Sequence, residues 1–132
     1  MNLLLDTHTF LWFADEQQSA NLPEPTKDLL IDGRNALFIS PASVWEMAIK
    51  VSIGKLKLTE PATRLVEFHL ANNSIRLLPV RLSHYSCIET LPLHHRDPFD
   101  RLLVSHALID GLPIVSIDNA FDQYGIERVW LA

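Results

Sequence analysis

Short apolar segments alternate with longer segments of helical periodicity along the whole chain. Five short, mostly apolar runs, each bounded by turn or capping residues, predict β-strands over 3–5, 36–39, 75–78, 113–117 and 128–131. The first, second and fourth runs are almost free of polar residues, which is typical of strands buried on both faces. Strands that alternate with helices predict an α/β fold with a mostly parallel sheet.

Helix signals lie between these strands. Apolar residues recur at helical spacing over 44–51 and over 99–107. Both helices begin with a capping side chain followed by a proline and end near a glycine: Ser40-Pro41 with Gly54, and Asp97-Pro98 with Gly111. Further helices are predicted over 23–32, 61–73 and 81–90.

Length and composition fit one ordinary globular domain. The chain has 132 residues, of which 48% are hydrophobic and 20% charged. The net charge of −5 argues against nucleic-acid binding through bulk positive charge. A single cysteine, Cys87, excludes an internal disulfide, and the start shows no basic, then apolar, leader pattern. Both features predict a cytoplasmic protein. No apolar run approaches the ~20 residues that span a bilayer, which argues against a membrane protein.

Acidic residues gather where a parallel sheet places its ligands. Asp6 ends the first predicted strand and Asp118 ends the fourth, while Glu46 and Asp100 lie near the starts of two helices. Because ligands bind beyond the carboxyl ends of parallel strands, these carboxylates are expected to converge. Close carboxylates raise one another's pKa unless a cation neutralises them. Hard oxygen ligands favour Mg²⁺ or Mn²⁺, whereas the chain lacks the Cys and His spacing of a zinc site.

Each acid also has a structural explanation. Asp6, Asp97 and Asp118 could cap helices, each contributing about 1 kcal/mol. Glu46 could pair with Lys50, four residues further along the helix. The remaining structural alternatives are capping boxes, Ser43 with Glu46 and Asp97 with Asp100. The helix that carries Glu46 already has a cap at Ser40. Of the four acids, Glu46 is therefore the one whose presence a role in helix stability explains least well.

Other chemistry is poorly supported. The chain contains no GxSxG, GxxxxGK or GxGxxG motif, which excludes P-loop and dinucleotide sites. Receiver-type phosphoacceptors need an acid pair after the first strand, and haloacid-dehalogenase-like phosphatases need Asp-x-Asp there; Asp6-Thr7-His8 provides neither. Arg96 and Arg101 flank the acids of the last long helix and are candidates for contact with phosphate or RNA.

Four segments of the chain form one pattern: Leu3-Leu4-Leu5-Asp6-Thr7-His8, Ser43-Val44-Trp45-Glu46, Arg96-Asp97-Pro98-Phe99-Asp100-Arg101-Leu102-Leu103 and Val115-Ser116-Ile117-Asp118. Together they resemble the PIN-domain family, and in particular the VapC-like toxins of bacterial type II toxin–antitoxin pairs. The resemblance covers nearly the whole chain. It implies one PIN domain over residues 1–132, with a mostly parallel five-stranded sheet in the order 3-2-1-4-5, flanked by helices.

The resemblance also implies a site and a function. It assigns the catalytic, metal-binding acids to Asp6, Glu46, Asp100 and Asp118, with supporting roles for Thr7, Ser116, Asp97 and Asp122. The implied enzyme is a Mg²⁺- or Mn²⁺-dependent endoribonuclease that hydrolyses RNA with a metal-activated water and leaves 5′-phosphate and 3′-hydroxyl ends. The implied partners are an RNA substrate (tRNA is one candidate), a cognate antitoxin and a second copy in a homodimer, in a bacterial cytoplasm. The alternative is a PIN-like RNA- or protein-binding module without catalytic activity.

Overall fold

Five parallel strands form the sheet in the part of the chain that the computed structural model describes, residues 1–72 and 74–132. Their order is β3-β2-β1-β4-β5, which confirms the predicted sheet. The strands are β1 (Asn2–Leu5), β2 (Ala36–Ile39), β3 (Arg76–Leu77), β4 (Ile114–Val115) and β5 (Arg128–Val129). β1 lies at the centre, where Leu4 pairs with Phe38 on one side and with Ile114 on the other.

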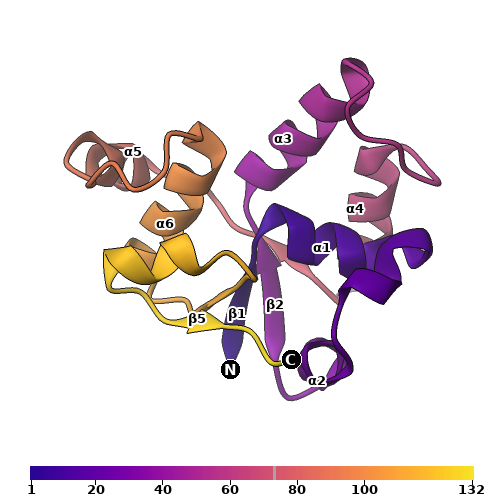
Figure 1. Cartoon of the computed structure of the whole chain (residues 1–132). Coiled ribbons are helices and arrows are strands. Elements are labelled where there is room, and N and C mark those ends of the chain that lie inside the picture. The colour runs from indigo at the N-terminus through magenta and orange to yellow at the C-terminus, as the bar shows by residue number, and fades with distance from the viewer. Residues whose placement is uncertain (73) are drawn as a thin grey trace.

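Helices cover both faces of this sheet. They are α1 (Thr7–Ala14), η1 (Glu16–Asn21), α2 (Glu24–Ile31), α3 (Pro41–Ser52), α4 (Ala62–Ala71), α5 (Leu82–Glu89), α6 (Pro98–Asp110) and η2 (Asn119–Tyr124). In Figure 1, α5 and α6 lie to one side of the central strands, and α3 and α4 to the other. No helix in the described ranges has both the length and the apolar character needed to cross a membrane.

The alternating side chains of β1 divide the core into two clusters. Leu3 and Leu5 pack with residues of α1, α2, α3 and α4, whereas Leu4 packs with residues of α6 and η2. Successive strand residues point to opposite faces, so one apolar strand joins both clusters. All three leucines are fully buried, as expected for a central strand.

The two helices with proline starts begin where the sequence predicts. Ser40 Oγ accepts a hydrogen bond from the Ala42 amide at 3.1 Å, and Asp97 Oδ1 accepts one from the Phe99 amide at 2.8 Å. α6 ends at Gly111, whose left-handed backbone, with φ of 66°, suits glycine. Both helix starts lie at the carboxyl edge of the sheet, because α3 follows the end of β2 and Asp97 lines the same cavity as Asp6 and Asp118.

The α-helix α1 was not predicted, and neither were the two 3₁₀ helices η1 and η2. The residues of α1 include threonines and aromatic side chains that form isolated helices poorly, so the local signal is weak. The helix forms because Asp6 caps it, accepting a hydrogen bond from the Thr9 amide at 2.8 Å, and because Phe10 and Leu11 are buried in the core. α1 thus begins directly at the end of β1.

Candidate metal centre

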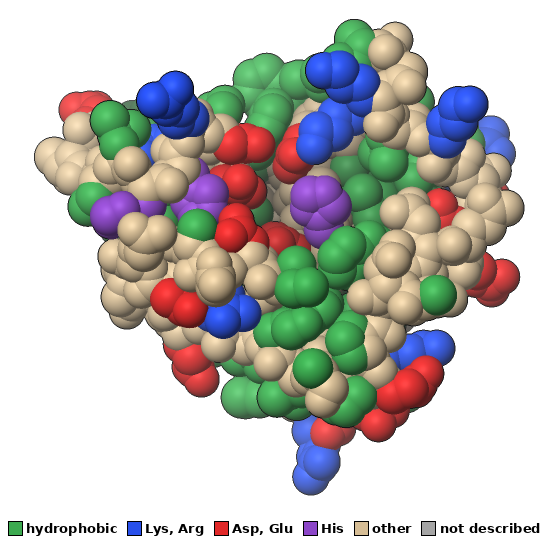
Figure 2. All heavy atoms as spheres, viewed as in Figure 1, with side chains coloured by type: hydrophobic (Ala, Val, Ile, Leu, Met, Phe, Trp, Pro, Cys, Tyr) green, Lys and Arg blue, Asp and Glu red, His purple; other side chains and the backbone are tan. Residues whose placement is uncertain are grey.

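A cavity of about 330 Å³ opens at the carboxyl edge of the sheet, where β1 and β4 end and α1, α3 and α6 begin. Figure 2 shows acidic side chains gathered around a hollow near the middle of this face. The residues that line the cavity are Asp6, Thr7, His8, Trp12, Glu46, Lys50, Asp97, Asp100, Ile117 and Asp118. The four acids that the sequence singles out therefore share one cavity.

Asp6 is almost completely buried, with 5% of its surface exposed, and hydrogen bonds hold its carboxylate in place. Its carboxylate accepts hydrogen bonds from the Thr9 amide at 2.8 Å and from the Ser116 hydroxyl at 2.5 Å. Burial raises the pKa of Asp6, and these hydrogen bonds oppose the rise only in part. Asp6 caps α1 and lines the cavity, so its structural and functional interpretations are compatible.

Glu46 is equally buried, in the middle of α3. The Thr7 hydroxyl donates to Glu46 Oε1 at 2.7 Å and lies 2.9 Å from Ser43 Oγ. Lys50 Nζ donates to Glu46 Oε2 at 2.7 Å, and this hydrogen bond raises the pKa of Lys50. Thr7 therefore orients Glu46, and the predicted pairing with Lys50 is present.

Asp100 lies in the first turn of α6, where its carboxyl group is only partly hydrated. Burial, together with the negative charges of Asp97, Glu46 and Asp6, raises the pKa of Asp100 to about 7, against the opposing effect of His95. Asp97 also lines the cavity while it caps α6. Repulsion between these carboxylates therefore lowers the stability of the folded protein when no cation is bound.

Asp118 follows β4 and caps η2, accepting a hydrogen bond from the Ala120 amide at 3.0 Å. His95 Nε2 lies 3.0 Å from Asp118 Oδ2. Burial opposes ionisation of Asp118, but the hydrogen bonds from His95 and Ala120 outweigh it, so the pKa of Asp118 is below its usual value. Ser116 connects this acid to Asp6 at the end of β1, because its hydroxyl oxygen accepts the Asp118 amide at 3.0 Å and donates to Asp6 Oδ2.

The donor set fits a divalent cation. Five carboxylates line the cavity with a single lysine, and Lys50 is already paired with Glu46. Within residues 1–72 and 74–132, no hydrogen bond reaches the Asp100 carboxylate. One ligand atom each of His95, Asp100 and Asp118 lie within 4.8 Å of one another. A cation with a preference for oxygen ligands would relieve the repulsion that raises the pKa of Asp100.

Three of the predicted contact and supporting residues lie elsewhere. Arg96 and Arg101 line a separate apolar cavity of about 550 Å³ between α3, α5 and α6. The Arg101 guanidinium donates to the carbonyl oxygens of Pro92 at 3.0 Å and Leu91 at 3.1 Å, so it fastens the preceding loop. Asp122 pairs with Arg128 at 2.9 Å and does not line the acidic cavity. Lys50 and His8, rather than the two arginines, are the basic side chains that line it.

Sequence reasoning missed His95. The residue stands next to the recognised Arg96-Asp97 segment, but neither periodicity nor a metal-binding spacing singles it out. The fold places it beside Asp118 because the Tyr124 hydroxyl accepts the His95 backbone N–H at 2.8 Å. Only proximity to the acidic motif could have drawn attention to it.

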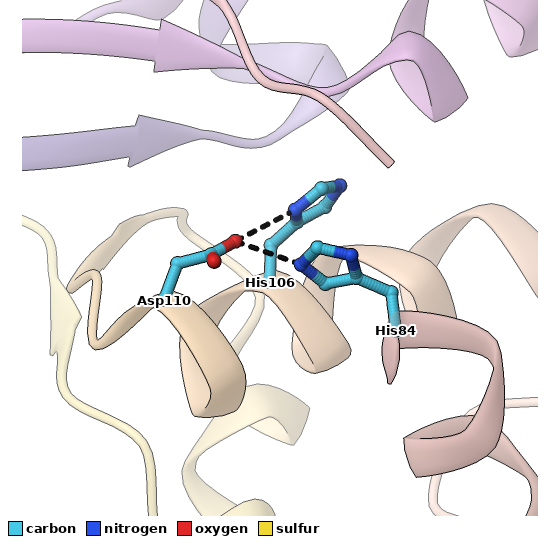
Figure 3. Close-up of side chains that lie close together, drawn as sticks. All are labelled: His84, His106 and Asp110. Atoms are coloured by element: carbon cyan, nitrogen blue, oxygen red, sulfur yellow. Dashed lines mark hydrogen bonds and ion pairs between the residues drawn. The ribbon is translucent and has the colours of Figure 1, made fainter. Parts of the chain in front are cut away.

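A separate cluster of two histidines and one aspartate connects α5 to α6 (Figure 3). His84 Nε2 and His106 Nδ1 lie 2.9 and 3.1 Å from the same oxygen of Asp110. The Arg81 amide donates to His84 Nδ1 at 2.9 Å, so the ring proton of neutral His84 must be on Nε2. A metal at Nε2 would force that proton onto Nδ1, against the Arg81 N–H. The cluster is therefore a hydrogen-bonded tie between two helices.

The fold and the cavity define an α/β protein with an acid-lined site at the carboxyl edge of a parallel sheet. Its sequence matches the model of the PIN domain over residues 3–127, so the chain belongs to the PIN domain family. A comparison with curated protein sequences finds no match.

Several solved structures share this fold. VapBC2 from Rickettsia felis, bound to a DNA fragment from its promoter, has a TM-score of 0.71 and 16% identity, with 99% of this chain and 100% of that chain covered. VapBC-1 from nontypeable Haemophilus influenzae has a TM-score of 0.64 and 18% identity, with 98% and 97% covered. FitAcB from Neisseria gonorrhoeae has a TM-score of 0.51 and 16% identity, with 96% and 95% covered. At these identities the likeness concerns the fold.

Proposed function

We propose that this chain is a Mg²⁺- or Mn²⁺-dependent endoribonuclease and the toxin of a type II toxin–antitoxin pair. The observation that carries the proposal is the convergence of Asp6, Glu46, Asp100 and Asp118 in one cavity at the carboxyl edge of the sheet. Membership in the PIN domain family supports a nuclease. The fold shared with VapBC2 and VapBC-1 supports the toxin role.

The chain's own residues hold and orient the reacting groups. A bound Mg²⁺ or Mn²⁺ would acidify a water and neutralise charge on the phosphate. Four acids, Asp6, Glu46, Asp100 and Asp118, would hold the cation through carboxylate oxygens. Ser116 and Thr9 fix Asp6, while Thr7 fixes Glu46, so the ligands need little rearrangement. The acids bind the cation and position the water; none of them attacks the phosphate.

The resemblance to PIN-domain toxins supplies the proposed products and the proposed place of action. Attack of the water on phosphorus would break the bond to the 3′-oxygen of the preceding ribose and leave 5′-phosphate and 3′-hydroxyl ends. RNA is the proposed substrate, with tRNA as one candidate. Such an enzyme would act in the bacterial cytoplasm, where its substrates are.

Two protein partners belong to the proposal. The fold likeness to VapBC2, VapBC-1 and FitAcB supports a cognate antitoxin that holds the nuclease inactive. We assign a second copy of the chain, in a homodimer, to the apolar surface around the 550 Å³ cavity. Trp45 and Leu93, which line this cavity, are 66% and 80% exposed, and burying them against a second copy would remove apolar surface from water.

Cleavage of RNA by antitoxin-free protein tests the catalytic proposal. A total-RNA or tRNA pool is incubated with Mg²⁺, Mn²⁺ or EDTA, and the wild type is compared with Asp6→Ala and Asp100→Asn. Asp122→Asn is the matched control, because Asp122 lies outside the acidic cavity. Cation-dependent cleavage that is lost in both site variants and kept in the control is expected.

Two other outcomes have definite meanings. Cleavage that persists in EDTA or in Asp100→Asn would show that the acidic cavity is not the nuclease site. Cation binding without cleavage of any RNA in the pool would favour the alternative, a PIN-like RNA- or protein-binding module.

A further inference from the structure

His95 joins two of the acids at the candidate metal centre. It lies in the loop between α5 and α6, and 9% of its side chain is exposed. Its Nε2 atom is 3.0 Å from Asp118 Oδ2, and one ligand atom each of His95, Asp100 and Asp118 fall within 4.8 Å of one another. The group therefore mixes one imidazole nitrogen with carboxylate oxygens.

The ring of His95 is held in place by two aromatic neighbours and at its other nitrogen. It stacks on Tyr124 with an interplanar angle of 11°, and its centroid lies 4.6 Å from that of Phe121. The Tyr124 hydroxyl oxygen accepts the His95 backbone N–H at 2.8 Å and lies 3.1 Å from Nδ1. These contacts direct Nε2 toward Asp118 without any help from a metal.

The spacing matches that of two neighbouring ligands on one ion. With bonds of about 2.1 Å, adjacent ligands of an octahedral ion are about 3.0 Å apart and opposite ligands about 4.2 Å. The 3.0 Å between His95 Nε2 and Asp118 Oδ2 equals the adjacent spacing.

The proton on the ring can also move, unlike that of His84. His84 Nδ1 faces a backbone N–H, which can only donate. His95 Nδ1 faces a hydroxyl, which can donate or accept. When the proton moves to Nδ1 and is donated to Tyr124, Nε2 presents a lone pair, which is the state that a metal ligand needs.

We propose that His95 ligates the cation through Nε2 and makes the site prefer Mn²⁺ over Mg²⁺. The inference rests on the proposed metal-dependent nuclease and names one residue that decides its cation. Mg²⁺ takes oxygen ligands and keeps its waters, whereas Mn²⁺, the first ion of the Irving–Williams order of divalent transition metals, gives up a water for an imidazole nitrogen more readily than Mg²⁺ does. If His95 only positions Asp118, by donating a hydrogen bond, it would not discriminate between the cations.

The test measures cation binding directly in the full chain. Pulsed electron paramagnetic resonance of bound Mn²⁺ detects a ligating imidazole through its ¹⁴N coupling, and calorimetry gives the dissociation constants of Mn²⁺ and Mg²⁺. His95→Gln is the informative variant, because a glutamine amide can still donate to Asp118 but has no imidazole nitrogen. The matched controls are His94→Gln, an exposed neighbour, and His8→Gln, the histidine that lines the acidic cavity.

The wild type and both controls are expected to show the ¹⁴N coupling, and His95→Gln to lack it. In His95→Gln the dissociation constant for Mn²⁺ should rise about 10-fold or more, while that for Mg²⁺ changes much less.

Three results would overturn the assignment. Bound Mn²⁺ without ¹⁴N coupling in the wild type, or coupling that persists in His95→Gln, leaves the proposed nuclease intact and removes His95 as a ligand. Coupling lost in His8→Gln instead would transfer the role to His8. No cation binding at all would remove both the ligand assignment and the metal-dependent function.

Discussion

Ser116 and Asp6, which are 110 positions apart in the chain, are joined by a buried hydrogen bond of 2.5 Å. The same serine oxygen accepts the Asp118 amide at 3.0 Å. One hydroxyl thus connects the acid that follows β1 to the acid that follows β4, and it holds two proposed cation ligands in register before any cation binds.

Ser116→Ala is expected to weaken both the fold and the site. Removing the hydroxyl leaves the buried Asp6 carboxylate with one partner fewer, which should lower the free energy of unfolding by about 1–3 kcal/mol. The proposed cation affinity should fall about 10-fold or more, because the ligand loses its support. Denaturant unfolding and calorimetry measure the two effects.

Ser105→Ala is the control for this change. Ser105 is also fully buried, but its hydroxyl donates only to the Leu102 carbonyl within α6. Cation affinity should be unchanged in this variant. Equal loss of affinity in both variants would show that Ser116 has no specific role at the site.

Asp100→Asn should stabilise the cation-free protein in a pH-dependent way. The pKa of Asp100 is raised to about 7 from an ordinary value of 3.8, so the folded state binds more protons than the unfolded state between these values. Stability contributed by protonated Asp100 is therefore lost as the pH rises from about 4 to about 7. Asparagine avoids this loss, and the variant should be more stable at pH 8 by roughly 1–3 kcal/mol, after allowance for the screening of a partly exposed group.

Thermal unfolding between pH 4 and pH 8, with EDTA and with Mn²⁺, checks this expectation. The difference between Asp100→Asn and the wild type should shrink toward pH 4. Added Mn²⁺ should stabilise the wild type more than the variant, because it neutralises the repulsion that the substitution removes. An Asp100→Asn protein that melts well below the wild type at pH 8 would make Asp100 a structural residue.

Asp110→Ala should destabilise the protein without affecting cation binding. The substitution leaves the N–H groups of buried His84 and His106 without their shared acceptor, at an expected cost of about 2–4 kcal/mol. A surface acid provides the comparison: Asp32 pairs with Arg34 on the surface, and Asp32→Ala should destabilise the protein much less than Asp110→Ala. Similar unfolding midpoints for the two variants would show that the histidine cluster contributes no more to stability than a surface ion pair does.

Trp45→Asp should dissociate the proposed homodimer. A carboxylate placed on the apolar surface between α3, α5 and α6 would have to lose its water on association. Sedimentation velocity should show a dimer for the wild type and for Ile31→Asp, an exposed apolar position that does not line this surface, and a monomer for Trp45→Asp. A monomeric wild type at all concentrations would refute the dimer.

The sequence by itself was enough to predict most of the fold. The apolar runs 3–5 and 36–39 both form strands, as predicted. The first is fully buried at Leu3, Leu4 and Leu5, whereas the second is buried on one face only, with Ala36 and Phe38 half-buried. Proline starts at Pro41 and Pro98 placed two helices correctly, since capping depends on neighbouring residues only. The convergence of acids such as Asp6 and Asp118 followed from parallel topology, which brings all strand ends to one edge.

Only the tertiary structure decided what depends on contacts between distant segments. The helix that starts at Thr7 gains its stability from core packing, which local propensity does not contain. Arg101 donates to loop carbonyl oxygens, and Asp122 pairs with Arg128. The sequence does not determine on which side of a motif a neighbouring side chain finds its partner. His95 reaches Asp118 because Tyr124, 29 positions away, holds its backbone and ring, and no periodicity or spacing encodes such a contact.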